Sequence, residues 1–164
     1  MSQTQAASDE PNLGIGSLYI IGFAQARAPH AGLLIPTSSS AGCLVHIRID
    51  RAESPNWQYQ ARAQNVKGDM FCTTLLKLHD LSDGPITTDQ LKLYAGSVAV
   101  PDNDEFGECL PWVMRVVDKL QEAGLLQGTD LDLLKDEFQA FASGNRAFAR
   151  RDRCPNVKVS AFCH

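Results

Sequence analysis

Among the five cysteines of this sequence, Cys109 has the position expected of a nucleophile. It falls in the first turn of a predicted helix, within the segment ECLPWVMRVVDKL. The first turn of a helix presents unpaired backbone N–H groups and the positive end of the helix dipole. That setting lowers the pKa of a thiol from about 8.5 and favours the thiolate, which is the nucleophilic form. Cys109 is therefore the candidate nucleophile.

Two histidines in the first half of the chain are candidate partners for this thiol. His30 begins a predicted strand directly after Pro29, and His46 lies in the middle of the next strand. Adjacent antiparallel strands can bring such side chains within reach of each other. A cysteine nucleophile needs a base, and the base benefits from an orienting partner. The alternative is structural, because free cysteines are often small core residues and a strand histidine can simply be packed or solvated.

The other residues of these types receive no catalytic role. They are predicted to lie in the core (Cys43, Cys72), in a C-terminal tail (Cys154, Cys163) or at a strand end (His79). No Cys-x-x-Cys pair occurs, and Cys163 beside His164 supplies two ligands, which do not make a zinc site. The sequence also lacks a Gly-x-Gly-x-x-Gly motif and a P-loop, so we expect no metal and no cofactor.

The first half of the chain must supply the strands that carry the histidines. Alternating or continuous apolar runs predict strands at residues 17–26, 30–36, 42–51, 56–64 and 73–79. In the third run Val45 and Ile47 share one face, and His46 and Arg48 share the other. The short, turn-rich links between the runs predict an antiparallel meander.

The apolar spacing in the second half of the chain predicts helices. A short helix is expected from Thr87 or Thr88 to Gly96, and a longer one from Cys109 to Ala123 with apolar residues at i, i+3, i+4 and i+7. A third opens at Thr129 with Asp132 three residues later, and a short strand is expected over 157–162. The fold class is therefore α+β, with an antiparallel sheet packed against helices.

Composition narrows the functional classes. The formal charge is −4, from 15 Lys and Arg against 19 Asp and Glu, which argues against a nucleic-acid partner. No apolar run is long enough to span a membrane. Residues 1–14 are predicted to be a disordered leader without signal-peptide features, and 15–164 a single domain in the cytoplasm, where thiols stay reduced.

The order of these segments resembles the circularly permuted papain-like, or NlpC-like, fold, the group that includes lecithin–retinol acyltransferase relatives. In that group the histidine strand precedes the cysteine helix. The phrases that carry the resemblance are HAGLLIP at 30–36 and the run from Glu108 to Val113, ECLPWV. The chain is also similar to a family of small uncharacterised fungal proteins, through Gly42 to His46, Trp57 to Tyr59, and the Cys-x-x-Trp-Val helix start.

This resemblance implies a role for each candidate. Cys109 would be the nucleophile, His30 its base, and His46 the residue that orients His30. Glu108 stands where the group commonly has Asn, and a carboxylate at this place would raise the pKa of the thiol. The implied activity is a thiol-dependent hydrolase or acyltransferase acting on an amide, ester or thioester of a small-molecule or peptide substrate.

Two other functions stay open at this point. The chain could keep this fold and use its groove to bind a small molecule or a protein without catalysis. Separately, four arginines near the C-terminus could hold an anion or form a solvated helix end (Arg146, Arg150, Arg151, Arg153). The sequence carries no trace of the acyl group, the acyl acceptor or the oligomeric state.

Overall fold

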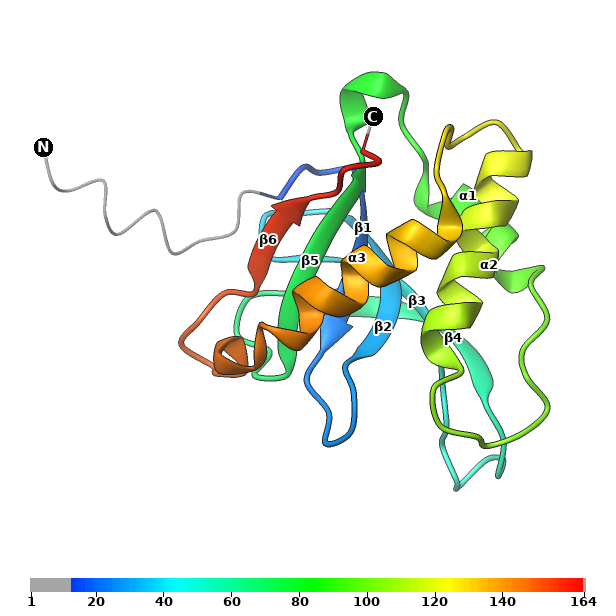
Figure 1. Cartoon of the computed structure of the whole chain (residues 1–164), viewed down its shortest axis with the longest axis vertical. Coiled ribbons are helices and arrows are strands. Elements are labelled where there is room, and N and C mark those ends of the chain that lie inside the picture. The colour runs from blue at the N-terminus through cyan, green and yellow to red at the C-terminus, as the bar shows by residue number, and fades with distance from the viewer. Residues whose placement is uncertain (1–12, 164) are drawn as a thin grey trace, which may run out of the picture.

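One mixed sheet forms the scaffold of the protein, as seen in the computed structural model, which describes residues 13–163 (Figure 1). Its strands are β1 (Leu18–Phe23), β2 (His30–Pro36), β3 (Ala41–Arg48), β4 (Gln58–Asn65), β5 (Cys72–His79) and β6 (Asn156–Val159). They are arranged in the order β4-β3-β2-β1-β5-β6. All neighbours are antiparallel except β5 and β6, which are parallel. Residues 1–12 of the predicted leader (1–14) and His164 lie outside the described residues.

The predicted meander is correct for four strands and wrong for the fifth. Strands β1 to β4 follow one another as antiparallel neighbours, but β5 returns across the sheet to pair with β1. The reason is burial: the side chains of β5 are buried on both faces of the sheet, so the strand is more stable inside the sheet than at the edge beyond β4. The polar β4 is left at the edge instead.

Three helices follow the first five strands and lie against one face of the sheet (Figure 1). They are α1 (Thr88–Gly96), α2 (Cys109–Glu122) and α3 (Leu131–Ser143), with 3-10 turns at Leu81–Asp83 and Arg146–Phe148. Thr87 and Gln90 form a capping box at the start of α1. The predicted cap of α3 at Thr129 is wrong by one residue, because the Asp130 side chain accepts the hydrogen bond from the Leu133 N–H.

Helix α2 is the central helix of the core. Eight of its side chains are buried, from Cys109 at its first position to Leu120 near its end. Burying each large aliphatic side chain contributes about 1.5–3 kcal/mol, which fixes the helix firmly on the sheet. The helix ends at Glu122, one residue before the predicted Ala123, and Gly124 after the cap residue Ala123 has the left-handed conformation expected at this position.

Apolar side chains fill both faces of the sheet. On the helix side, Ala31, Leu33, Val45 and Ile47 pack with α2 in the larger cluster. On the other side, a smaller cluster includes Tyr19, Ile21, Leu34 and Leu44. Leu13 also packs there, although the sequence places it in the predicted leader. Since successive strand residues point to opposite faces, His46 shares the face of Leu44, away from the helices.

No helix among residues 13–163 has the length and apolar character needed to cross a bilayer.

Candidate functional site

Cys109 lies at the start of α2, where the sequence places it, and its sulfur faces the beginning of β2. The turn before the helix contains Gly107, whose φ of 92° is a left-handed conformation that favours glycine. Glu108 is the cap residue but makes no side-chain capping bond; its Oε2 instead accepts a hydrogen bond from Asn103 Nδ2 at 3.1 Å. Backbone hydrogen bonds to the sulfur come from Ala31, Leu110 and Cys109 itself. The thiol therefore lies next to the residue that follows His30.

The pKa of Cys109 differs from the sequence expectation. Burial raises the pKa of this thiol above its ordinary value, and the three backbone hydrogen bonds lower it by less than burial raises it. The prediction of a lowered pKa from the helix start alone is therefore wrong, because it omitted the loss of water around the sulfur. Glu108 is not among the causes of the shift. At neutral pH the thiol is protonated.

The two predicted histidines form a hydrogen-bonded relay with a third residue. His30 Nε2 and His46 Nδ1 are 2.8 Å apart, and their rings meet edge to face. His46 Nε2 lies 2.8 Å from Oε1 of Gln60, the residue directly opposite His46 in the β3–β4 register. Pairing of β2, β3 and β4 thus holds the three side chains in line.

Both imidazoles are neutral. Burial, followed by the charges of His46 and Arg62, lowers the pKa of His30 to about 3. Burial also lowers the pKa of His46 to about 4, although its hydrogen bond to Gln60 acts in the opposite direction. The positive charges of Arg62 and Arg48 lower the pKa of His46 further, so neither ring carries a charge at neutral pH.

The relay determines which nitrogen of His30 is a base. Because the amide oxygen of Gln60 only accepts, Nε2 of His46 carries its proton and Nδ1 of His46 is an acceptor. Nε2 of His30 must then donate to His46, which leaves Nδ1 of His30 with a lone pair. Among the described residues, no hydrogen bond uses this Nδ1 atom. Nδ1 of His30 is therefore an unoccupied hydrogen-bond acceptor.

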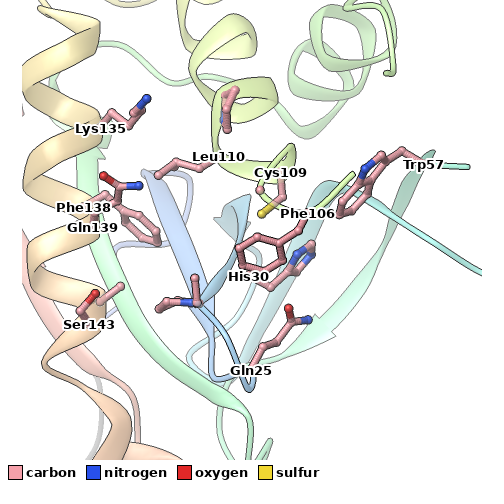
Figure 2. Close-up of a pocket in the computed structure, with 15 residues that line it drawn as sticks. Gln25, His30, Trp57, Phe106, Cys109, Leu110, Lys135, Phe138, Gln139 and Ser143 are labelled. Atoms are coloured by element: carbon pink, nitrogen blue, oxygen red, sulfur yellow. The ribbon is translucent and has the colours of Figure 1, made fainter. Parts of the chain in front are cut away.

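Cys109 and His30 line one cavity of about 430 Å³, which we call the thiol pocket (Figure 2). Its walls come from the β1–β2 turn, the segment before α2, the start of α2, and one face of α3. The side chains that line it and are labelled in Figure 2 are Gln25, His30, Trp57, Phe106, Cys109, Leu110, Lys135, Phe138, Gln139 and Ser143. Figure 2 shows the sulfur and the imidazole on the same side of the pocket, with the ring of Phe106 beside them. Among the described residues, no hydrogen bond joins the sulfur to His30 or His46.

His46 does not line the thiol pocket. It lines a separate cavity with His30, Arg62 and Phe71. His30, at the first position of β2, contributes to both cavities. The structure therefore brings His30 to Cys109 through a shared pocket, and His46 to His30 through a hydrogen bond.

Sequence reasoning missed Gln60 and the residues that fix the rim of the pocket. Gln60 could have been found from the alternation of polar residues in β4, which places a glutamine across from His46. Trp57 is held at the rim because its Nε1 donates to the carbonyl oxygen of Glu105 at 3.0 Å. No local sequence pattern indicates this contact, since it joins residues 48 positions apart.

In the part of the chain that the structure describes, the other cysteines and histidines lie outside the thiol pocket. Cys72 is fully buried, as predicted, and burial raises its pKa to about 12, whereas Cys43 is only half-buried. His79 Nε2 is 2.6 Å from the carbonyl oxygen of Gly84, consistent with a strand-end role. Within residues 13–163 no group of three or more His, Cys, Asp or Glu side chains is arranged to hold a metal.

Comparisons of the chain with family models, with curated proteins and with solved structures found no match.

Proposed function

We propose that this protein is a thiol-dependent hydrolase or acyltransferase that uses Cys109 as nucleophile and His30 as base. The observation that carries the proposal is the relay from Gln60 through His46 to His30. It leaves a lone pair on Nδ1 of His30, and His30 and Cys109 line the same pocket. A relay of this kind fixes the tautomer of a catalytic imidazole. The histidine-before-cysteine order and the sheet-and-helix architecture support a permuted papain-like fold for the enzyme.

The proposed reaction has two stages. The Cys109 S–H proton passes to Nδ1 of His30 as the sulfur attacks the carbonyl carbon of an amide, ester or thioester. The carbonyl bond to the leaving group then breaks, and the imidazolium returns its proton to that group. In the second stage water or an acyl acceptor, deprotonated by His30, attacks the carbonyl carbon of the acyl-Cys109 thioester. The bond to sulfur breaks, the acyl group leaves with the acceptor, and the imidazolium returns the proton to the sulfur. The backbone N–H of Cys109 is the first candidate donor to the developing oxyanion.

A neutral thiol–imidazole pair, rather than a preformed ion pair, is the resting state in this mechanism. Burial raises the pKa of Cys109 and lowers the pKa of His30, so the proton stays on sulfur until substrate arrives. The proton then moves together with attack on the carbonyl. His46 stabilises the imidazolium by accepting the hydrogen bond from Nε2 of His30. A thiol nucleophile stays reduced in the cytoplasm, and this is the location we propose.

A binding module of the same fold is the second candidate. It is favoured by the protonated thiol and by the lack, within the described residues, of a hydrogen bond between Cys109 and His30. In apo enzymes, however, catalytic hydrogen bonds are often long and tighten only with substrate. Activity measurements separate the two candidates.

The test is turnover of p-nitrophenyl esters and of small acyl thioesters by the purified protein. We expect Cys109→Ala to abolish turnover and His30→Asn to reduce it by about 10²–10⁴-fold, the usual contribution of a general base. Cys43→Ala is the matched control, because Cys43 is a half-buried thiol outside the thiol pocket. Undiminished turnover in Cys109→Ala or His30→Asn would exclude this mechanism.

A further inference from the structure

The lining of the thiol pocket continues into a second, smaller cavity. This cavity, of about 200 Å³, is lined by Arg27, Arg146, Thr73 and Ser143, among others, and we call it the arginine cavity. Gln25, Pro29, Ala142 and Ser143 line both cavities, so the two adjoin each other. Figure 2 shows Gln25 and Ser143 at the same end of the thiol pocket. A ligand that occupies the thiol pocket can therefore extend into the arginine cavity.

The charged side chains that line the two cavities are all positive. It contains three cationic side chains, Lys135, Arg27 and Arg146, and no Asp or Glu. The chain as a whole has more acidic than basic residues, 19 against 15, so a lining without carboxylates departs from its average surface. Such a lining raises the local concentration of anions and disfavours cations.

The two arginines are oriented by neutral groups. The Arg27 guanidinium lies over the ring of Phe106, 3.7 Å from its centroid, and Arg146 Nη1 donates to the carbonyl oxygen of Gln25 at 3.4 Å. No ion pair among the described residues uses Arg27, Arg146 or Lys135. Their charges are therefore available to a ligand.

The structure divides the four arginines that the sequence analysis grouped as an anion site. Arg150 pairs with Asp152 through two hydrogen bonds of 2.9 and 2.7 Å. Arg153 lies over the ring of Phe148. Arg146 alone of the four lines the arginine cavity, where Arg27 joins it from the β1–β2 turn.

We propose that the substrate of Cys109 carries an anionic group, a carboxylate or a phosphate, that binds between Arg27 and Arg146. This inference rests on the proposed function. The apolar part of the substrate lies against Leu110 and Phe138 in the thiol pocket, with its reacting carbonyl at Cys109. The anionic group accepts hydrogen bonds from the guanidinium groups, which suit planar or tetrahedral oxyanions.

Lys135 has a smaller role in this arrangement. Lys135, Gln139 and Ser143 are spaced four residues apart and follow one face of α3 along the pocket (Figure 2). Eight residues of helix separate Lys135 from Ser143, a distance of about 12 Å. Lys135 is thus at the far end of the pocket from the arginine cavity and acts on the anion only at long range.

The experiment measures binding with three probes that share one apolar ring system: naphthylacetate, naphthyl phosphate and the neutral naphthylacetamide. Affinities for the wild-type protein are compared with those for Arg27→Gln, Arg146→Gln and the double variant, by titration calorimetry or NMR. Arg150→Gln is the matched control, because Arg150 is paired with Asp152 and lines neither cavity. Both cavity arginines are exposed, so their replacement leaves the fold intact.

We expect at least one anionic probe to bind about tenfold more tightly than the amide, at low salt. The double variant should lose most of that preference without weakening binding of the amide, and Arg150→Gln should keep it. The tighter of the two anionic probes identifies the group as carboxylate or phosphate. Equal binding of anionic and neutral probes, or an unchanged preference in the double variant, would overturn the proposal.

These results are separable from the test of the proposed function. An arginine-dependent anion preference in a protein that transfers no acyl group would support the anion site and overturn the catalytic role. Acyl transfer by a protein without such a preference would overturn the anion site and leave the catalytic role standing.

Discussion

At the scale of single residues, the central feature is a buried thiol and a buried, neutral imidazole that line the same pocket. Loss of water raises the pKa of Cys109 and lowers the pKa of His30, and both shifts oppose a resting ion pair. The hydrogen bonds that Gln60 accepts from His46 and that His46 accepts from His30 then determine which nitrogen of His30 accepts a proton. Reactivity at this site is therefore expected only with a bound carbonyl substrate.

Alkylation measures the thiol directly. Because the pKa of Cys109 is raised, its thiolate fraction at neutral pH is below that of an exposed thiol. We expect iodoacetamide to modify Cys109 more slowly than glutathione near pH 7, with the rate rising as the pH increases, as measured by peptide mass spectrometry. A rate at neutral pH equal to or above that of glutathione would show a preformed ion pair and contradict the neutral resting state.

Protonation of the two histidines should make stability depend on pH. The folded-state pKa values of His30 and His46, about 3 and about 4, lie below the ordinary value of 6.5. At a pH between these values and 6.5, the unfolded chain therefore binds more protons than the folded protein. Stability should therefore fall as the pH drops from about 6.5 towards 4, by up to about 1.4 kcal/mol per pH unit for each histidine. Urea unfolding measures this slope. A slope that is the same in a His30→Asn, His46→Asn double variant would assign the effect to other groups.

At the scale of elements, the close approach of β2 and β3 holds the relay together. Gly32 permits this approach, because an added Cβ would lie 2.8 Å from Leu44 Cδ1 and 3.0 Å from both His46 Cβ and the Val45 carbonyl oxygen. Movement of one flexible side chain cannot remove all three close contacts, because the contact with the Val45 carbonyl oxygen is with backbone.

A substitution at this glycine tests the arrangement. We expect Gly32→Ala to lower the free energy of unfolding by about 1–3 kcal/mol and to disturb the imidazole resonances of His46 in NMR spectra. The control is Gly96→Ala at the end of α1, where the nearest atom outside the helix to a new Cβ is Tyr59 Cε2 at 3.9 Å. That change should be neutral or stabilising by up to about 1 kcal/mol. Equal effects at the two glycines would mean that β2 and β3 can move apart freely.

The elements themselves were largely predictable, because they depend on local patterns. The range of β2 and the first residue of α2 agree with the sequence prediction, since Pro29 and the 3.6-residue apolar period mark them locally. The pairing of β5 with β1 and the contact of Gln60 with His46 depend on packing between distant segments. The sign of the Cys109 pKa shift depends on burial, which residue spacing does not report.

At the scale of the whole molecule, the pocket and the core share side chains. Phe138 of α3 lines the thiol pocket and is 1% exposed, and it belongs to the same cluster as Trp112 of α2 and Leu76 of β5. The face of α3 that shapes the pocket is therefore held by the core that stabilises the fold.

Truncation of the Phe138 side chain should lower the stability of the whole molecule. We expect Phe138→Ala to lower the free energy of unfolding by about 3–5 kcal/mol. Circular dichroism and tryptophan fluorescence should report the same shifted midpoint, because α3 and the sheet unfold together. Phe141→Ala, at a half-buried position three residues further along α3, should be clearly less destabilising. Separate transitions for the two signals would mean that α3 unfolds independently of the sheet.

The most direct test of the catalytic account is to trap the acyl-enzyme. The protein is mixed with a p-nitrophenyl ester, quenched in acid, and digested, and the acylated peptide is located by mass spectrometry. We predict one acyl group on Cys109 in the wild-type protein, none at this site in Cys109→Ala, and formation at least about 10²-fold slower in His30→Asn. Acylation of Cys109 at the same rate in wild type and His30→Asn, or no acylation of Cys109 by any ester or thioester that the protein hydrolyses, would contradict the account.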